Sequence, residues 1–81
     1  MNLDYTERFI KSLEGAPPDI QKAFYKQTRL LLQDLRHPSL RAKKYDEARN
    51  VWQARVTRSW RFYFLIQDDT YYLLDIIAHP K

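Results

Sequence analysis

The chain has 81 residues and a formal net charge of +4 at pH 7, with no cysteine, one glycine and two histidines. This length predicts a single domain over residues 1–81, whose folding buries only about 60 to 65% of the unfolded surface. The composition argues against disulfides, a zinc site and a glycine-rich phosphate loop, so we expect no metal and no cofactor. Aromatic and aliphatic packing must then supply the stability.

The start of the chain lacks the basic and then apolar layout of a signal peptide. No apolar run approaches the roughly 20 residues that a membrane span needs. We therefore expect a cytoplasmic protein with no membrane partner.

The N-terminal part of the chain predicts a short strand followed by a helix. Leu3 and Tyr5 fit the strand, and Thr6 or Asp4 is placed to cap a helix that ends at residues 15–18.

A second, longer helix is expected from Pro18 to about Arg36, because proline suits the first turn of a helix. Its apolar stripe consists of Ile20, Ala23, Phe24, Leu31 and Leu35. Pro38 ends it, since the residue before a proline is pushed out of helical geometry. His37 is interpreted as a C-terminal helix residue favoured by the helix dipole.

The second half of the chain predicts three strands, at about 51–57, 60–67 and 70–78. A basic segment at 39–50 comes before them and reads as a loop with room for a short strand around 41–44. Strands joined by turns this short run antiparallel. The expected fold class is α+β, with two N-terminal helices packed on one face of a small, mainly antiparallel β-sheet.

Alternation along these strands predicts which side chains face solvent. The residues expected in the core are Trp60, Phe62, Phe64 and Ile66, with Tyr72, Leu74 and Ile76 from the last strand. Arg55 and Arg61 then lie opposite each other on the open face of the sheet. Like charges at such positions are destabilising, which indicates that the pair holds an anion.

Asp75 constrains the last hairpin, because an unpaired carboxylate in the core would be costly. We expect it on the open face, paired with Tyr63, which needs one more loop residue than a two-residue turn at 68–69. In this register His79 lies opposite about Ser59, near the two arginines.

Basic residues are concentrated in one part of the sequence. Residues 1–35 carry five Lys or Arg and five Asp or Glu, whereas residues 36–61 carry eight and two, an excess of six positive charges. Such a patch is typical of nucleic-acid binding. A solvated basic face, or a surface for an acidic protein partner, explains the charge alone equally well.

Several short segments together carry a resemblance to a known family. They are Arg36 to Leu40 leading into Lys43 and Lys44, Trp52 to Val56, Trp60 to Phe64, and Asp75 to His79. In order and spacing they resemble the RelE/ParE toxin superfamily of bacterial toxin–antitoxin systems, over nearly the whole chain. RelE-like members cut mRNA in the ribosomal A site, with the 2′-hydroxyl attacking the neighbouring phosphate, whereas ParE-like members inhibit DNA gyrase.

The resemblance implies roles for particular residues and partners. The implied catalytic residues are Arg61, His79, Arg55 and Glu47, and the implied RNA-binding residues are Arg41, Lys43, Lys44, Arg55 and Arg58. The implied partners are a cognate antitoxin, mRNA and the A site of the 70S ribosome. The residue types suit the reaction, because the planar arginine fork matches phosphate oxygens and histidine exchanges protons near neutral pH.

Other interpretations stay open. Arg61 could simply pair with Asp75, and His79 could be a frayed terminal residue. Relatives have a tyrosine where Pro80 follows His79, and many have a C-terminal helix that is absent here; both departures argue against full nuclease activity. The alternatives to an endoribonuclease are a gyrase inhibitor of the ParE type and a catalytically inactive nucleic-acid-binding relative.

Overall fold

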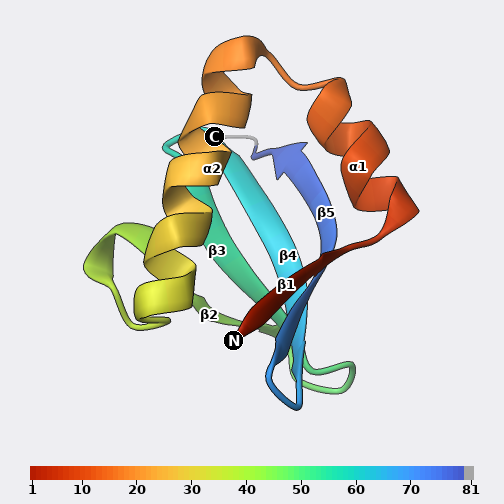
Figure 1. Ribbon diagram of the computed structural model, residues 1–81, viewed down its shortest axis with the longest axis vertical. Coiled ribbons are helices and arrows are strands. Elements are labelled where there is room, and N and C mark those ends of the chain that lie inside the picture. The colour runs from red at the N-terminus through yellow and green to blue at the C-terminus, as the bar shows by residue number, and fades with distance from the viewer. Residues whose placement is uncertain (80–81) are drawn as a thin grey trace.

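The computed structural model describes residues 1–79. Its elements are β1 (Asn2–Tyr5), α1 (Glu7–Glu14), α2 (Pro18–Gln33), the 3-10 turn η1 (Pro38–Leu40), β2 (Lys43–Asp46), β3 (Val51–Thr57), β4 (Trp60–Gln67) and β5 (Thr70–Ala78). They form a five-stranded sheet of order β1-β5-β4-β3-β2, in which only β1 pairs in parallel. Figure 1 shows both helices in front of the sheet, with α2 alongside β3 and α1 beside β5. The predicted α+β fold is therefore confirmed.

Thr6 begins α1 and also fixes it to the sheet. Its hydroxyl oxygen accepts a hydrogen bond from the Phe9 backbone N–H at 3.1 Å, the contact expected of a residue that caps a helix. The same hydroxyl donates to the Leu73 carbonyl of β5 at 3.0 Å. The position of α1 is thus set by a local cap and by a contact with the far end of the chain.

The second helix ends at Gln33, three residues before the predicted end. Asp34 is in extended conformation, and its carboxylate accepts a hydrogen bond from the Arg36 N–H at 2.9 Å. Such a local side-chain contact competes with helical hydrogen bonds. The interpretation of His37 as a helix C-terminal residue is wrong: it begins η1, where its Nδ1 accepts from the Ser39 N–H at 3.1 Å.

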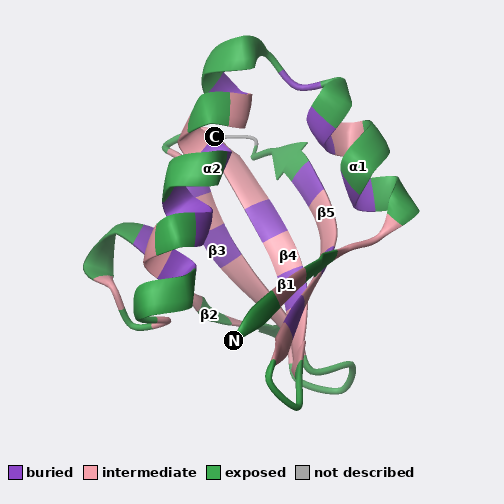
Figure 2. Ribbon diagram, in the orientation of Figure 1, coloured by how far each residue is buried: buried purple, intermediate pink, exposed green. Residues whose placement is uncertain are grey.

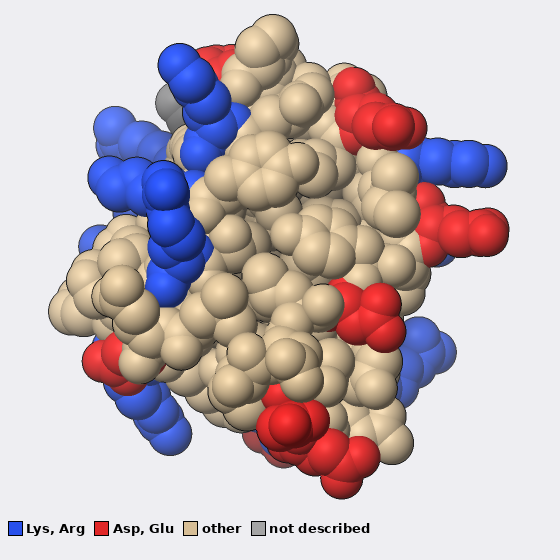
Figure 3. Space-filling model, in the orientation of Figure 1, with Lys and Arg blue, Asp and Glu red and all other residues tan. Residues whose placement is uncertain are grey.

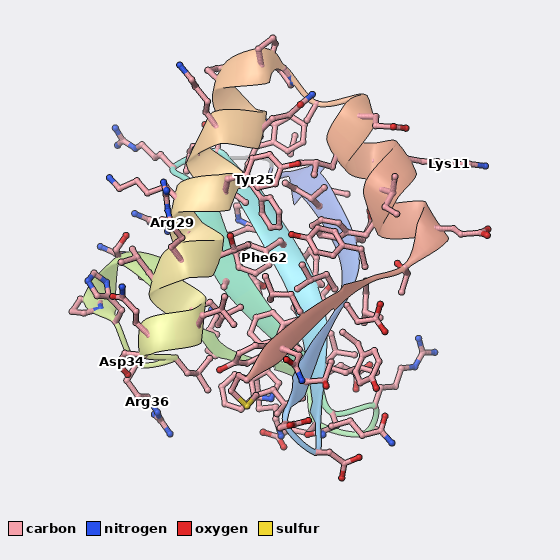
Figure 4. All side chains as sticks on the ribbon, in the orientation of Figure 1. Lys11, Tyr25, Arg29, Asp34, Arg36 and Phe62 are labelled. Atoms are coloured by element: carbon pink, nitrogen blue, oxygen red, sulfur yellow. The ribbon has the colours of Figure 1, made fainter. Side chains whose placement is uncertain are left out.

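The core lies between the helices and the sheet and is built largely from aromatic rings. Phe24 of α2 and Phe62 of β4 are completely buried and meet edge to face, with ring centroids 5.4 Å apart. Figure 4 shows Phe62 on β4, beside α2 in this view. In Figure 2 buried and partly exposed positions alternate along β3 and β4, as a sheet with one covered face requires.

Buried Gln27 ties three elements together at the basic end of the domain. Its Nε2 donates to the Ser39 carbonyl at 3.2 Å and to the Arg55 carbonyl at 2.9 Å, and its Oε1 accepts from the Ser39 hydroxyl at 3.2 Å. A buried amide of this kind is stable only when its polar atoms are paired. It holds α2, η1 and β3 in a fixed arrangement.

The last hairpin reaches the expected pairing by a different route. Tyr63 pairs with Asp75 as predicted, but the turn at Asp68 and Asp69 has two residues, because Gln67 pairs with Thr70. The additional residue is a β-bulge at Leu74, between the Tyr63–Asp75 and Phe64–Leu73 pairs.

The bulge reverses the side-chain alternation partway along β5. Tyr71 and Leu73 are buried before it and Ile76 after it, so the expected burial of Tyr72 and Leu74 was wrong. In β4, Phe62 and Phe64 are completely buried as predicted. Trp60 and Ile66, at the two ends of that strand, are only partly buried, although both contact the core.

Candidate anion-binding and catalytic site

The hairpin of β3 and β4 sets two arginines side by side on the open face. Ala54, Val56 and Phe62 point into the core, so Arg55 and Arg61 point away from it. The two arginines are paired across the strands, as the sequence predicted, next to a register shift between Arg55 and Thr57. The repulsion between them makes the position favourable for an anion.

Arg61 also closes the turn of this hairpin. Its Nη1 donates to the carbonyls of Thr57 at 2.8 Å, Trp60 at 3.0 Å and Arg58 at 3.2 Å. A charged donor bound to several carbonyls is a strong local constraint. The guanidinium is therefore held in one orientation while its remaining N–H groups are available to a ligand.

Arg55 has no protein acceptor for one of its donors. Within residues 1–79 its Nε is shielded from solvent and lacks a hydrogen-bond partner. Loss of water lowers the pKa of Arg55, and the positive charges of Arg41, Arg61 and Arg58 lower it further. A buried donor without a partner is costly, and here a bound anion would supply the acceptor.

His79 is placed beside the arginines by the end of β5. Trp60 pairs with Ala78, and the His79 backbone N–H donates to the Ser59 carbonyl at 2.6 Å. This confirms the predicted place of His79 opposite Ser59. The side chain is exposed. Pro80 lies outside the described residues.

These side chains line one cavity of about 380 Å³ on the open face. Its lining is Arg41, Lys43, Gln53, Arg55, Arg61 and His79. Arg41 directly follows η1, has a left-handed backbone φ of 47°, and lines the cavity with its side chain. No acidic side chain lines the cavity within the described part of the chain. It thus combines four permanent cations with one side chain that can transfer a proton.

Three of the residues predicted for the site do not line this cavity. Lys44 lies on the other face of β2, with its Nζ 5.3 Å from the centroid of the Trp52 ring and 3.9 Å from the Glu47 carboxylate. Glu47 itself is exposed in the turn between β2 and β3, away from the end of the sheet that carries His79. Arg58 is exposed in the hairpin turn and offers only its carbonyl, to Arg61.

Asp75 has its own partners and does not pair with Arg61. Its carboxylate accepts from the Ser12 hydroxyl at 2.7 Å and from the Ile76 N–H at 2.9 Å, and it lies 3.2 Å from the Arg8 Nε. The proposed pairing of Arg61 with Asp75 was therefore wrong. Among residues 1–79, no carboxylate is paired with Arg61.

Gln53 and an aromatic pair were missed by the sequence analysis. Gln53 lies between Lys43 of β2 and Tyr63 of β4, and period-two alternation from Arg55 would have placed it in the site. Tyr63 meets Tyr45 edge to face at 4.9 Å. Burial and then Tyr45 raise the pKa of Tyr63, while the positive charge of Arg61 opposes this change.

Within residues 1–79, no group of three His, Cys, Asp or Glu side chains is arranged to hold a metal ion. No helix in this same part of the chain is long and apolar enough to cross a membrane.

Comparison with known proteins identifies the fold. No family model matches the sequence, and no curated protein matches it significantly. Solved structures do match. The YoeB/ParE toxin from Agrobacterium tumefaciens superposes with a TM-score of 0.80 at 12% identity, over 99% of this chain and 100% of that one. The isolated RelE toxin of E. coli gives 0.78 at 14% identity, over 99% and 85%.

A third match comes from a complex. The toxin–antitoxin complex RelBE2 from Mycobacterium tuberculosis contains a chain that superposes with a TM-score of 0.76 at 20% identity, over 98% of this chain and 96% of that one. The agreement spans both helices and the sheet. The chain therefore has the fold of the RelE/ParE toxin superfamily.

Proposed function

We propose that this chain is the toxin of a toxin–antitoxin system and that it is an endoribonuclease. The observation that carries the proposal is the cavity lined by Arg55, Arg61 and His79, together with Arg41 and Lys43. The basic patch supplies long-range attraction for a polyanion, and the cavity supplies a place for one phosphate. The fold shared with RelE supports this assignment.

The proposed reaction is attack of an RNA 2′-hydroxyl on the adjacent phosphorus. A new P–O2′ bond forms, the P–O5′ bond breaks, and the products are a 2′,3′-cyclic phosphate and a 5′-hydroxyl. Arg55 and Arg61 stabilise the charge that develops on the non-bridging oxygens. His79 gives its proton to the departing 5′-oxygen, and water accepts the proton of the 2′-hydroxyl. Glu47 has no part in this scheme, because it does not line the cavity.

The proposed partners are a cognate antitoxin, mRNA and the A site of the 70S ribosome. Several matching structures are complexes of a toxin with its antitoxin, including a RelB–RelE complex from Methanococcus jannaschii. An antitoxin that covers the open face with acidic or apolar side chains would exclude RNA from the cavity.

A second candidate is a toxin that acts without cutting RNA, either on gyrase or as a nucleic-acid-binding protein. The observation in its favour is that Arg61 already has a structural partner set, the three carbonyls of its own hairpin. These contacts would stabilise the hairpin even if Arg61 took no part in catalysis.

Induction in a bacterial host followed by mapping of mRNA 5′ ends separates the two candidates. We expect new 5′ ends within the codons of translated messages, and none after induction of His79→Gln. Growth arrest with a DNA-damage response and no new ends would instead support the gyrase inhibitor. Expression of the neighbouring gene's product should relieve the growth arrest if that product is the antitoxin.

A further inference from the structure

A second cavity, of about 440 Å³, lies between α2, η1 and the edge of β3, next to the first cavity. Its lining is Ala23, Lys26, Gln27, Pro38, Ser39, Arg41, Arg55 and Val56. It exists because β2 pairs with β3 only as far as Gln53, so the rest of β3 is an edge that α2 and η1 approach. Arg41 and Arg55 line both cavities, which makes the two adjoin.

The second cavity has donors in excess of acceptors. Its acceptors are already in use. The Gln27 amide oxygen accepts from the Ser39 hydroxyl, and the Ser39 and Arg55 carbonyls accept from the Gln27 Nε2. The shielded Nε of Arg55 finds no acceptor within residues 1–79. No acidic side chain of the described residues lines this cavity, whereas Lys26 does. The cavity therefore carries the positive charges of Lys26, Arg41 and Arg55, with no carboxylate of the described residues in its lining to balance them.

The surroundings extend this positive charge along α2. Lys22, Lys26 and Arg29 recur at intervals of three and four residues, which places them along one side of the helix. Figure 3 shows lysine and arginine side chains gathered on the α2 side of the molecule, with the acidic ones mostly on the opposite side. Figure 4 shows Arg29 pointing outward on that side.

We propose that this cavity binds a second phosphate of the same RNA strand, with Arg55 between the two phosphates and Lys26 contacting the outer one. The identity of the strand rests on the proposed function, whereas the anion site does not. A nucleic-acid backbone fits two adjoining cationic cavities because it repeats a single charge at regular spacing, and the arginine fork suits phosphate oxygens. The strand would pass from the open face, over the free edge of β3, towards α2.

The first part of the test follows the anion site directly. Inorganic phosphate is titrated into the full chain while the Nε–H signals of the arginines are observed by NMR. We expect the Arg55 signal to shift, and Lys26→Ala to weaken the apparent affinity of the phosphate that moves it by roughly tenfold, as the loss of one charge-assisted hydrogen bond implies. Lys22→Ala is the matched control, because it removes the same charge from the same helix without lining the cavity. An Arg55 signal that ignores phosphate would overturn the proposal.

The second part uses single-stranded RNA that cannot be cut, with a 2′-O-methyl group at each position, as a dinucleotide with one phosphate and as a hexanucleotide. The wild type and Lys22→Ala should bind the hexanucleotide roughly tenfold more tightly than the dinucleotide, and Lys26→Ala should lose this gain. Equal affinities of Lys26→Ala and Lys22→Ala for the hexanucleotide would overturn the proposal. The proposal would also be overturned if a glutamate-rich peptide shifted the Arg55 signal and the hexanucleotide did not.

Failure of the proposed function has a different signature. If the chain cuts no RNA but keeps the phosphate shift and the length-dependent gain that requires Lys26, the second site stands and the nuclease assignment falls. If RNA is cut at the wild-type rate by a Lys26→Ala protein that also retains the length-dependent gain, the nuclease stands and the second site falls.

Discussion

Arg61 links the turn of the β3–β4 hairpin to the cavity of about 380 Å³ on the open face. Its Nη1 is occupied by the carbonyls of Thr57, Arg58 and Trp60, and the cavity receives the rest of the guanidinium. Replacement of Arg61 should therefore affect both stability and activity.

Arg61→Ala should lower the rate of RNA cleavage by about 10² to 10³, the usual effect of removing one preorganised charge contact. It should also lower the free energy of unfolding by about 1 to 3 kcal/mol, because the turn loses a charged donor. Single-turnover cleavage and urea unfolding measure the two effects. Arg58→Ala is the control, since it keeps the turn carbonyl and does not line the cavity. Wild-type cleavage by folded Arg61→Ala would remove Arg61 from the site.

For His79, the structure places the backbone by a 2.6 Å hydrogen bond to Ser59 and leaves the side chain exposed beside the arginines. His79→Gln should lower cleavage by about 10² to 10⁴ and remove one limb of the pH–rate profile, while binding of uncleavable RNA stays unchanged. His37→Gln, at the start of η1, should retain the wild-type profile. If His79→Gln cleaves normally, another group protonates the leaving oxygen and His79 is a bystander.

At the scale of the element, β2 places two consecutive lysines on opposite faces of the sheet. Lys43 lines the cavity on the open face, whereas Lys44 lies over the Trp52 ring on the other face. The alternation of a strand imposes this difference.

The two lysines should therefore differ in their effect on RNA binding. Lys43→Ala should weaken binding and reduce the slope of log affinity against log salt by about 1, as expected for one lost phosphate contact. Lys44→Ala should leave the slope nearly unchanged. Fluorescence anisotropy over a range of salt concentrations gives both slopes. Equal slopes for the two variants would mean that Lys43 does not contact phosphate.

Tyr71, at the contact between β5 and α2, should make the free energy of unfolding depend on pH. This side chain is buried, and its hydroxyl donates to the Leu31 carbonyl at 3.5 Å. Burial raises the pKa of Tyr71, and the negative charge of Asp34 raises it further. The folded chain then holds the phenolic proton more tightly than the unfolded chain does. Its contribution is fully present below about pH 10 and is lost as the pH rises through the folded pKa.

Tyr71→Phe should accordingly flatten the fall of unfolding free energy above about pH 10, by up to 1.4 kcal/mol per pH unit for one proton. Urea unfolding at a series of alkaline pH values measures this slope. Tyr25→Phe, at an exposed position on α2, should keep the wild-type slope. A slope unchanged in Tyr71→Phe would assign the alkaline transition to other tyrosines, such as Tyr5 or Tyr63, whose pKa values are also raised by burial.

At the scale of the whole molecule, an 81-residue chain without disulfides has a small core, so a partner that binds its folded state should add appreciably to its stability. An antitoxin present at 100 times its dissociation constant should add about 2.7 kcal/mol to the free energy of unfolding. For a domain of this size that corresponds to a rise in Tm of about 10 to 20 °C. Thermal unfolding with and without the neighbouring gene's product tests this. A copurifying protein that leaves Tm unchanged at saturation would not be bound to the folded chain.

Local sequence signals were sufficient for much of the architecture. The three long strands at 51–57, 60–67 and 70–78 match β3, β4 and β5, because alternation and short turns depend on neighbouring residues alone. Thr6 caps α1 as expected. The same alternation predicted that Arg55 and Arg61 face each other on the open side, which is the basis of the candidate site.

Contacts between distant segments decided the rest. The bulge at Leu74 lets Asp75 meet Ser12 and Arg8 while Leu73 stays buried, and no local pattern reveals that compromise. The place of Glu47 away from the cavity follows from the pairing of β2 with β3. Arg55 lines both cavities because α2, η1 and β3 meet at one edge of the sheet. The sequence by itself therefore determined which side chains share a face, because that depends on backbone period, whereas only the tertiary structure determined which of them meet a common ligand.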